Sequence, residues 1–380
     1  MENLIPGPPW QVRQTTLEVN LGHLKKNFYL LKKEAKNADL MVLLKSDAYG
    51  FSHKEVAETL DALPREAGLH GFAVANVEEG IILRRSKIRK PVYVLSGIQQ
   101  MDEDLYRCLQ TCALIPVISS LKVLRALDSF CRRAQSPQNF HLKLNTGMNR
   151  LGLDPEEIPQ AINILEKNKL LRMDGLMSHY ACSEKPNSLL TKNQSKIFIS
   201  ILEAFRKSGF NPRYIHMENS YGLLNHCLPQ GNIARVGLHL YGENNEKMLP
   251  VAHWSAQVYQ TRNLKKGDVV GYGPLYRAKR KMRMAILGVG YGDGYHRAFS
   301  NRAEVLIHGV RCPVIGAVSM DLTAVDITKL SHIKENSRAT LLGVDGKDRI
   351  TAEELAKYAK CIPWEILTGI SPRVPRVFIQ

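Results

Sequence analysis

Several features that would assign a chain of 380 residues to a particular class are missing here. The seven cysteines form no Cys-x-x-Cys pair and show no zinc-ligand spacing, which argues against a metal cage. The first residues lack the basic and apolar segments of a signal peptide, and no apolar run approaches the length of a membrane span. A doubly wound dinucleotide-binding sheet needs a Gly-x-Gly-x-x-Gly turn after an early strand, and none is present. We therefore expect a reduced, soluble, cytoplasmic protein without a metal.

Acidic residues are also scarce, because 36 Asp and Glu face 52 Lys and Arg and leave a net charge of +16. Such a balance can indicate nucleic acid, an anionic membrane surface or an acidic ligand. Most of the cations are spread through helix-like segments, and the densest run, Arg277–Arg283, alternates into an apolar strand. The pattern favours a generally basic surface, and we expect no nucleic-acid or membrane partner.

Residues 40–240 repeat one pattern, an apolar segment followed by a polar loop and a helix-like stretch. Strands that alternate with helices pair in parallel, and about eight such units favour an (α/β)8 TIM-like barrel over an open sheet. We assign residues 1–242 to this barrel. The expected strands are Met41–Lys45, Gly71–Ala75, Val92–Ser96, Leu114–Ser119, His141–Asn145, Gly175–His179, Tyr214–Asn219 and Ile233–Leu240.

Residues 243–380 have a different pattern, with short strands, tight turns and little helix, which is typical of a mainly antiparallel β domain. One helix is predicted by the capping box Thr351-Ala-Glu-Glu354. Residues 1–20, which include the alternating segment Thr15–Asn20, can pair with this domain rather than with the barrel. The expected strands are Ala252–Gln260, Met284–Gly288, Ala303–His308, Pro313–Val318 and Ala339–Leu342.

Polar residues recur where the barrel strands are expected to end, and barrel chemistry is found at that face. Two of the loops, Asn219-Ser220-Tyr-Gly222 and Arg235-Val-Gly237-Leu238, combine a hydroxyl with glycine-opened backbone N–H groups that suit a phosphate. Together these residues predict a functional site on one face of the barrel. They are Lys45, Ser96, Asn145, His179, Asn219 with Ser220, and Arg235.

Lys45 is the most informative of these residues, because it follows four apolar residues and precedes Ser-Asp-Ala-Tyr-Gly50. Lysine is almost never buried without a partner. Taken alone, the pattern is more typical of a lysine that snorkels from a strand end. The alternative is an amine held in a cleft to form a Schiff base with a carbonyl cofactor.

The motifs, in their order and spacing, resemble the alanine racemase family of fold-type III pyridoxal-phosphate enzymes. The similarity extends from Trp10 to Arg376. The motifs are Lys45-Ser-Asp-Ala-Tyr49-Gly50, His141-Leu-Lys143-Leu-Asn-Thr-Gly-Met-Asn-Arg150-Leu-Gly152, Gly175-Leu-Met-Ser-His179-Tyr-Ala181, His216-Met-Glu-Asn-Ser220, Arg235-Val-Gly237-Leu-His-Leu-Tyr-Gly242, Gly290-Tyr291-Gly-Asp-Gly294, Ser319-Met320-Asp321 and Ile362-Pro-Trp-Glu365.

The resemblance implies an isomerase that interconverts L- and D-alanine for peptidoglycan precursors, with pyridoxal 5'-phosphate on Lys45. It implies Lys45 and Tyr291 as the two bases and a homodimer in which each site takes Lys45 from one chain and Tyr291 from the other. Arg150 and the backbone N–H of Met320 are implied for orienting the substrate carboxylate and the cofactor, and Lys143 is a position that members often carbamylate. The implied cofactor-binding residues are Lys45, Tyr49, His179, Asn219, Ser220, Arg235, Gly237, Leu238 and Trp364.

Two of these assignments have chemical consequences. Arginine does not give up its proton, so Arg235 leaves the pyridine nitrogen unprotonated, which favours simple proton exchange over transamination. Removal and return of a proton on opposite faces of Cα need two bases. A tyrosine titrates near pH 10, so an ionised Tyr291 at pH 7 requires about 4 kcal/mol of environmental help. The expected source is the basic neighbourhood of His179 and Arg235.

The chain departs from the family pattern at several positions. Phe51-Ser52 replaces the usual His-Gly, Asn145 and Asn149 replace the more frequent Asp and Gly, and Ser319 stands where cysteine is common. Trp364 occupies the place of a tyrosine that reaches the phosphate, and indole is larger and only donates. The alternatives are a racemase of broader specificity for serine or other small amino acids, a decarboxylase, and a pyridoxal-phosphate-binding protein that is no racemase.

Overall fold

A computed structural model describes residues 15–96, 98–228, 230–243 and 245–380. The chain divides into two compact units, each formed by segments that are distant in the sequence. One contains Phe28–Ala48 and His53–Gly237, and the other contains Tyr49–Ser52, Leu238–Gln380 and the described part of Met1–Asn27. Helix α1 (Leu21–Ala35) continues from the second unit into the first.

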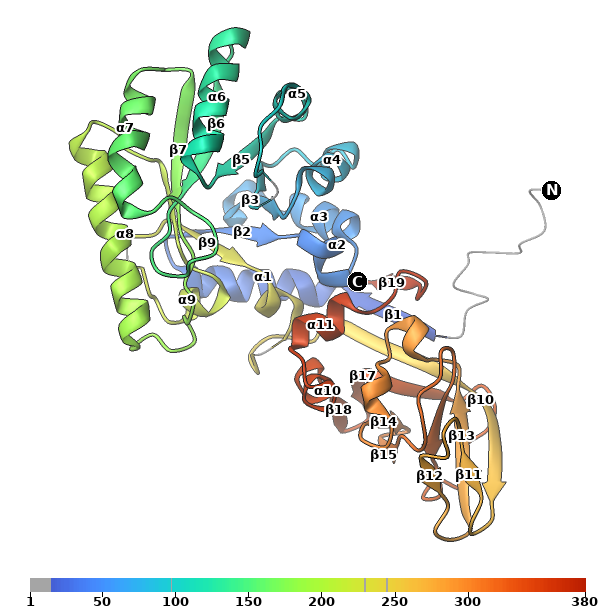
Figure 1. The fold of residues 1–380 in the computed structure, drawn as a ribbon. Coiled ribbons are helices and arrows are strands. Elements are labelled where there is room, and N and C mark those ends of the chain that lie inside the picture. Colours follow the sequence, from blue (N-terminus) through green and yellow to red (C-terminus); the bar gives the residue numbers. More distant parts are fainter. Residues whose placement is uncertain (1–14, 97, 229, 244) are drawn as a thin grey trace, which may run out of the picture. The chain divides into compact units, whose positions relative to one another are not determined.

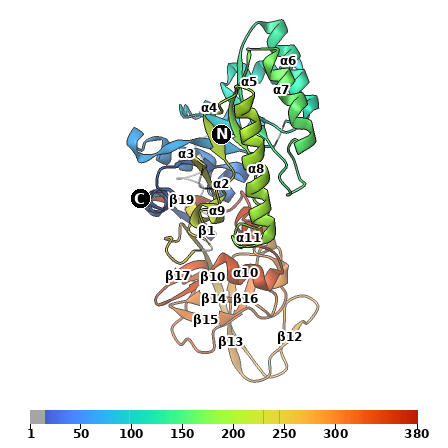
Figure 2. The same ribbon diagram turned by 90° about the vertical axis from the view of Figure 1, so that its left-hand side faces the viewer.

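The first unit is an eight-stranded parallel barrel, as the strand–helix alternation predicted. The strands follow the order β8-β7-β6-β5-β4-β3-β2-β9, and every ladder is parallel. Helices lie on the outside of the strands (Figures 1 and 2). The strands are β2 (Asp39–Leu43), β3 (Leu69–Val74), β4 (Val92–Val94), β5 (Leu114–Ile118), β6 (Gln138–Lys143), β7 (Leu171–Met177), β8 (Tyr214–His216) and β9 (Ile233–Val236).

The helices of this unit are amphipathic, and most of those with described caps start at a side chain that accepts a backbone N–H. Ser120 caps α6 and Ser188 caps α8, as expected for hydroxyl N-caps. The ring closes between β8 and β9 through backbone bonds, from Asn232 N to Ile215 O at 3.0 Å and from Arg235 N to Glu218 O at 3.1 Å. The helices are α2 (Lys45–Gly50), α3 (His53–Asp61), α4 (Val77–Arg85), α5 (Glu103–Thr111), α6 (Leu121–Ala134), α7 (Ile158–Glu166), α8 (Leu189–Lys207) and α9 (Ser220–Leu224).

The second unit is built on antiparallel pairs. Strand β10 (Ala252–Leu264) is the longest and pairs with β1 (Thr15–Asn20), β13 (Met282–Leu287) and β17 (Arg338–Asp345). Strand β1 also pairs in parallel with β19 (Arg376–Ile379). The remaining elements are β11 (Val269–Val270), β12 (Tyr276–Arg277), β14 (Glu304–Ile307), β15 (Val310–Pro313), β16 (Thr323–Asp326), β18 (Asp348–Ile350), α10 (Ala352–Ala359) and α11 (Pro363–Thr368).

Some expected boundaries were wrong. No strand covers Pro313–Val318 as expected: β15 ends at Pro313, Val314 makes only an isolated bridge to Val325, and Gly316 takes a positive φ of 77° that a strand does not accommodate. Strand β16 was not predicted. The helix predicted from Thr351 is α10, and its cap is confirmed by the bond from Glu354 N to Thr351 Oγ1 at 3.1 Å.

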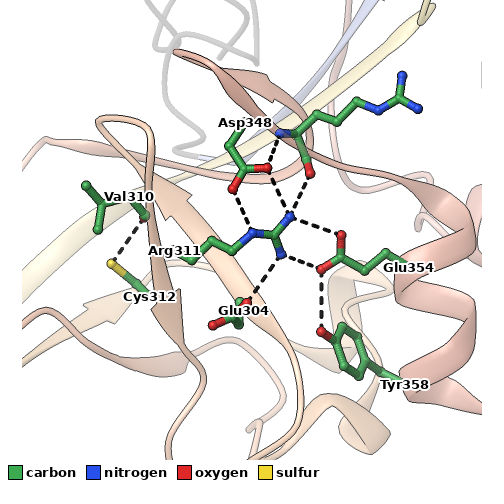
Figure 3. A network of polar contacts seen from close by, with 8 residues as sticks. Glu304, Val310, Arg311, Cys312, Asp348, Glu354 and Tyr358 are labelled. Carbon is green, nitrogen blue, oxygen red and sulfur yellow. Dashed lines mark hydrogen bonds and ion pairs between the residues drawn. The ribbon is translucent and has the colours of Figure 1, made fainter.

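Arg311 on β15 joins three elements of this unit through its guanidinium (Figure 3). It makes bidentate hydrogen bonds to Asp348, at 2.7 and 3.1 Å, and to Glu354, at 2.6 and 3.3 Å. It also reaches Glu304 at 3.3 Å. These carboxylates raise the pKa of Arg311, so the group stays charged. A network of this kind stabilises more than an isolated surface ion pair.

Among the described residues, no helix combines the length and the apolar composition that crossing a bilayer requires. The same residues contain no group of three or more His, Cys, Asp and Glu side chains that could hold a metal. All seven cysteines are free thiols.

Candidate active site

Polar residues follow the carboxyl ends of the barrel strands, as predicted. Ser96, Asn145 and His179 each lie two residues beyond the end of a strand. Asn219 lies three residues beyond β8, and Arg235 is inside β9. Since the strands are parallel, these side chains gather at one end of the barrel.

Lys45 does not end a strand, contrary to our prediction. Strand β2 ends at Leu43, and Lys45 opens the short helical turn α2. The turn is left-handed, because Ser46, Asp47, Ala48 and Tyr49 have φ between 52° and 61°. For residues with a side chain this conformation costs roughly 1–2 kcal/mol each, so the surrounding structure must impose it.

Glu79, which the sequence analysis missed, holds the start of this turn. Its Oε1 accepts from Ser46 N at 2.7 Å, and its Oε2 accepts from Ala75 N at 2.7 Å. Glu79 itself is fixed in a capping box with Asn76 at the start of α4. The signal was present as Asn-x-x-Glu after an apolar strand, but a capping box alone does not identify a distant partner.

Lys45 and Lys143 are amines whose environment lowers their pKa. Burial and the nearby Arg150 lower the pKa of Lys45, although the carboxylate of Glu79 opposes them. Burial, together with Arg235, Arg150 and Lys45, lowers the pKa of Lys143 to about 8. A neutral amine is the nucleophilic form, so a lowered pKa raises the fraction of each lysine that can react with an electrophilic carbon.

Arg235 is fully buried, and its Nη nitrogens lie within hydrogen-bonding distance of four protein acceptors, three of which share the two hydrogens of Nη2. Nη1 donates to His216 Nδ1 at 2.9 Å, and Nη2 donates to His179 Nδ1 at 2.9 Å. Nη2 also donates to Ser178 O at 2.9 Å and to Met217 O at 3.0 Å. Burial lowers the pKa of Arg235 to about 10, so it remains a cation at neutral pH. Its Nε–H has no partner among the described residues.

Two histidines that the sequence analysis missed, His216 and His141, extend a chain of hydrogen bonds from Arg235 into the barrel. Arginine only donates, so Nδ1 of His216 must accept, and its Nε2 carries the proton. That Nε2 lies 2.7 Å from Nδ1 of His141, whose own proton is therefore on Nε2. Burial lowers the pKa of both rings, that of His141 to about 3, so both are neutral. Both residues stand in motifs that were quoted above, but no spacing rule links them.

The predicted phosphate loops meet at Ser220 and Gly237. Ser220 Oγ accepts from Gly237 N at 3.2 Å. The Oδ1 of Asn219 is used within the loop, where it accepts from Gly222 N at 2.9 Å and from Ser183 Oγ at 2.7 Å. Asn219 therefore shapes the loop as the N-cap of α9.

The segment before Arg150 is a turn organised by Asn145. Its Oδ1 accepts from the N–H groups of Gly147 and Asn149, and its Nδ2 donates to Asp154 at 2.7 Å. Asn149 has a φ of 58°, a conformation that glycine adopts freely and asparagine tolerates. The departure from glycine at this position is thus compatible with the turn. The Arg150 side chain is exposed.

Tyr291 and Met320 belong to the other unit, where their loops are joined. Tyr291 N donates to Ser319 O at 3.0 Å, and Gly292 N donates to Met320 O at 2.9 Å. The side chains are 45% and 54% exposed, and they line a hollow of ≈ 960 Å³ together with Tyr272. Buried Asp293 anchors this region through Arg373 at 2.9 Å.

Three further predicted residues also lie in this unit. Tyr49 is buried against Tyr241, with ring centroids 5.0 Å apart, and burial raises the pKa of its hydroxyl. Leu238 is buried at the start of a short 3-10 helix. Trp364 lies in the first turn of α11 and is partly exposed.

Comparison with known proteins agrees with this geometry. Residues 19–245 match the family "Alanine racemase, N-terminal domain", and residues 251–378 match "Alanine racemase, C-terminal domain". The alanine racemase of Citrifermentans bemidjiense is 36% identical over 97% of this chain and 99% of its own length. The crystal structure of alanine racemase from Streptomyces lavendulae superposes with a TM-score of 0.89, at 25% identity, over 99% of this chain and 98% of that one. The structure from Bartonella henselae, which has covalently bound pyridoxal phosphate, gives a TM-score of 0.85 at 23% identity, over 96% and 99% of the two chains.

Proposed function

The chain belongs to the alanine racemase family, and on this basis we propose that it interconverts L-alanine and D-alanine with pyridoxal phosphate held covalently by Lys45. The observation that carries the proposal is the Arg235 guanidinium. Both Nη nitrogens donate to protein acceptors, whereas Nε–H donates to none of the described residues and can therefore bond an external group. A ring nitrogen with a free lone pair fits that donor.

The residues of the barrel fit the cofactor at its other positions. The lowered pKa of Lys45 provides a nucleophilic amine for a carbonyl carbon. Ser220 Oγ and Gly237 N–H lie beside each other at strand ends, where a phosphate is commonly held. We further place Tyr49, Leu238 and Trp364 at the phosphate and His179 beside the ring. When bound, pyridoxal phosphate withdraws electrons and makes the Cα proton of an amino acid acidic.

We assign the proton transfers to Lys45 on one face of Cα and Tyr291 on the other. Each is a single titratable group that can take a proton and return it. Arg150 is a cation on an exposed turn and suits a substrate carboxylate, and we assign the backbone N–H of Met320 to the same task. The low pKa of Lys143 suits addition of CO2, which would place a negative charge beside Arg150.

We also propose that the enzyme is a homodimer with shared sites. In the second unit the hollow beside Tyr291 is lined by exposed side chains, with Tyr272 at 75% and Leu322 at 42% exposure. Large apolar side chains gathered in this way are typical of an interface. A two-fold axis uses each interface twice, so two complete sites form. The proposed setting is the cytoplasm, where D-alanine is supplied for peptidoglycan precursors.

The test is to incubate the purified protein with a panel of L-amino acids and separate the products by chiral chromatography. We expect D-alanine without release of CO2, and loss of activity in Lys45→Ala. Borohydride reduction and peptide mapping should place the cofactor on Lys45. A label on another lysine, or D-serine as the dominant product, would favour a different anchor or the broader specificity.

A further inference from the structure

The second unit carries a basic surface formed by two turns that the sequence separates. The first turn, Lys265-Lys266, joins β10 to β11, and the second, Ala278–Lys281, joins β12 to β13. Leu264 pairs with Met282 in the β10–β13 ladder, so both turns leave the sheet at the same point. Gly267 N donates to Ala278 O at 2.8 Å, and Ala278 N donates to Asp268 O at 2.8 Å. The two lysine-bearing turns therefore lie side by side at one end of this unit (Figure 1).

The charge of this surface is almost entirely of one sign. Between residues 261 and 283 the chain has a single acidic residue, Asp268, and its carboxylate accepts from the backbone of Lys265 at 2.8 Å. Among the described residues, none of the seven exposed cations forms an ion pair with a carboxylate. We call these cations the basic end; they are Arg262, Lys265, Lys266, Arg277, Lys279, Arg280 and Lys281.

The cations of the basic end are flanked in the sequence by buried apolar residues. Leu264, Ala278 and Met282, which flank the lysines in the sequence, are buried in one apolar cluster with Met284. Because these flanking residues are buried, the side chains of the cations between them extend into the solvent. Arg283 differs from them, because its guanidinium is used by the carbonyl groups of Leu330, Ser331 and Ile333. Arg277 also has a structural bond, from its guanidinium to Gly267 O at 2.6 Å, whereas the side chains of Lys279, Arg280 and Lys281 bond to none of the described residues.

Like charges that converge without carboxylate partners repel one another, so such a group attracts an external anion. We propose that the basic end binds the surface of an anionic phospholipid bilayer. Our expectation of no membrane partner rested on cations that looked dispersed along the sequence, whereas the fold brings two basic segments together. Turns with long, flexible cations can all meet a flat surface, and each cation adds attraction to anionic headgroups.

Nucleic acid fits the same residues less well. Binding to single strands relies on exposed aromatic rings on which bases stack. Of the two tyrosines between the basic turns, Tyr276 packs against the apolar cluster, with its hydroxyl 3.5 Å from the sulfur of Met282, and exposed Tyr272 belongs to the hollow beside Tyr291. With no helix able to span a bilayer among the described residues, the predicted contact is electrostatic and reversible. This proposal does not depend on the catalytic one.

The test uses the full-length holoenzyme and sedimentation with vesicles of phosphatidylglycerol and phosphatidylcholine, or of phosphatidylcholine alone. We expect binding to the anionic vesicles only, with a loss of about tenfold between 50 and 300 mM salt, because the contact is screened. The triple variant Lys265→Glu/Lys266→Glu/Lys281→Glu should weaken binding by at least about tenfold. The matched control, Lys33→Glu/Lys167→Glu/Lys207→Glu, changes the net charge equally at exposed positions of the barrel unit and should weaken it by less than about twofold.

Three results would overturn the proposal. They are equal binding to neutral vesicles, an equal effect of the control variant, and no binding to anionic vesicles at 50 mM salt. A duplex DNA that binds more tightly than the vesicles at the same salt, and is lost in the same triple variant, would assign the surface to nucleic acid. Unchanged melting temperature and racemase activity in both variants show that the fold is intact.

Discussion

Arg235 donates to Nδ1 of His216 across 2.9 Å, and this contact fixes where two buried protons lie. His216 must hold its proton on Nε2 and donate it to His141. The contact thereby holds the guanidinium in one orientation, which also fixes the direction in which its Nε–H points.

We predict that His216 and His141 are both neutral Nε2–H tautomers from pH 5 to pH 8. Burial lowers both pKa values, so neither ring gains a proton in this range. Long-range proton–nitrogen NMR spectra of histidine-labelled protein measure this directly. An Nδ1–H signal from either ring, or its titration above pH 5, would contradict this arrangement of hydrogen bonds from Arg235 through His216 to His141.

Replacing Glu79 by glutamine should loosen the left-handed turn. The glutamine amide keeps one acceptor oxygen, but its NH2 group would face one of the two backbone N–H groups, and two donors do not bond. The variant should therefore lose about 1–2 kcal/mol of unfolding free energy. The pKa of Lys45 should fall further, because the carboxylate of Glu79 raises it. Urea unfolding and the pH dependence of amine labelling measure the two effects. Glu78→Gln, on the exposed side of the same helix, should change neither.

Carbamylation of Lys143 should rise steeply with pH at constant CO2 pressure. CO2 adds to the neutral amine, and with a pKa of about 8 the neutral fraction is about one tenth at pH 7 and about nine tenths at pH 9. Carbon NMR with labelled bicarbonate follows the adduct. Lys143→Arg should remove the signal, and uptake that does not change between pH 7 and 9 would show that the amine is not the titrating group.

Much of this architecture could be predicted from the alternation of apolar strands and amphipathic helices, because barrel and β domain differ in that pattern. The left-handed turn could not. Ser46, Asp47, Ala48 and Tyr49 are ordinary right-handed residues by propensity, and their positive φ values are imposed by distant groups such as Glu79. The hydrogen bond between His141 and His216 could not be predicted for a similar reason, because the two residues are 75 positions apart and only the barrel brings them together.

Trp364→Tyr should tighten retention of pyridoxal phosphate or extend the substrate range to serine-sized amino acids. A tyrosine hydroxyl can both donate and accept, whereas indole only donates and occupies more space. Dialysis followed by cofactor absorbance, together with the chiral assay, provides the two measurements. If retention and substrate range both stay the same, residue 364 is only a packing residue.

A mixture of two inactive proteins, Lys45→Ala and Tyr291→Phe, should recover activity if sites are shared. Random pairing makes about half of the dimers mixed, and each mixed dimer has one intact site, so about a quarter of wild-type activity is expected. Mass spectrometry of intact dimers confirms that the chains have exchanged. Exchange without recovery would mean that Tyr291 serves the lysine of its own chain.

The pairing of β1 with both β10 and β19 has a consequence for synthesis of the protein. A ribosome releases β1 first and β19 after the whole barrel, so the sheet that contains them cannot be completed during most of translation. The strands of the barrel lie together between residues 39 and 236, which allows that unit to fold while the chain is still growing. Until β10 emerges, β1 has an unpaired edge, and this interval is when a nascent chain is most prone to aggregate or to need a chaperone.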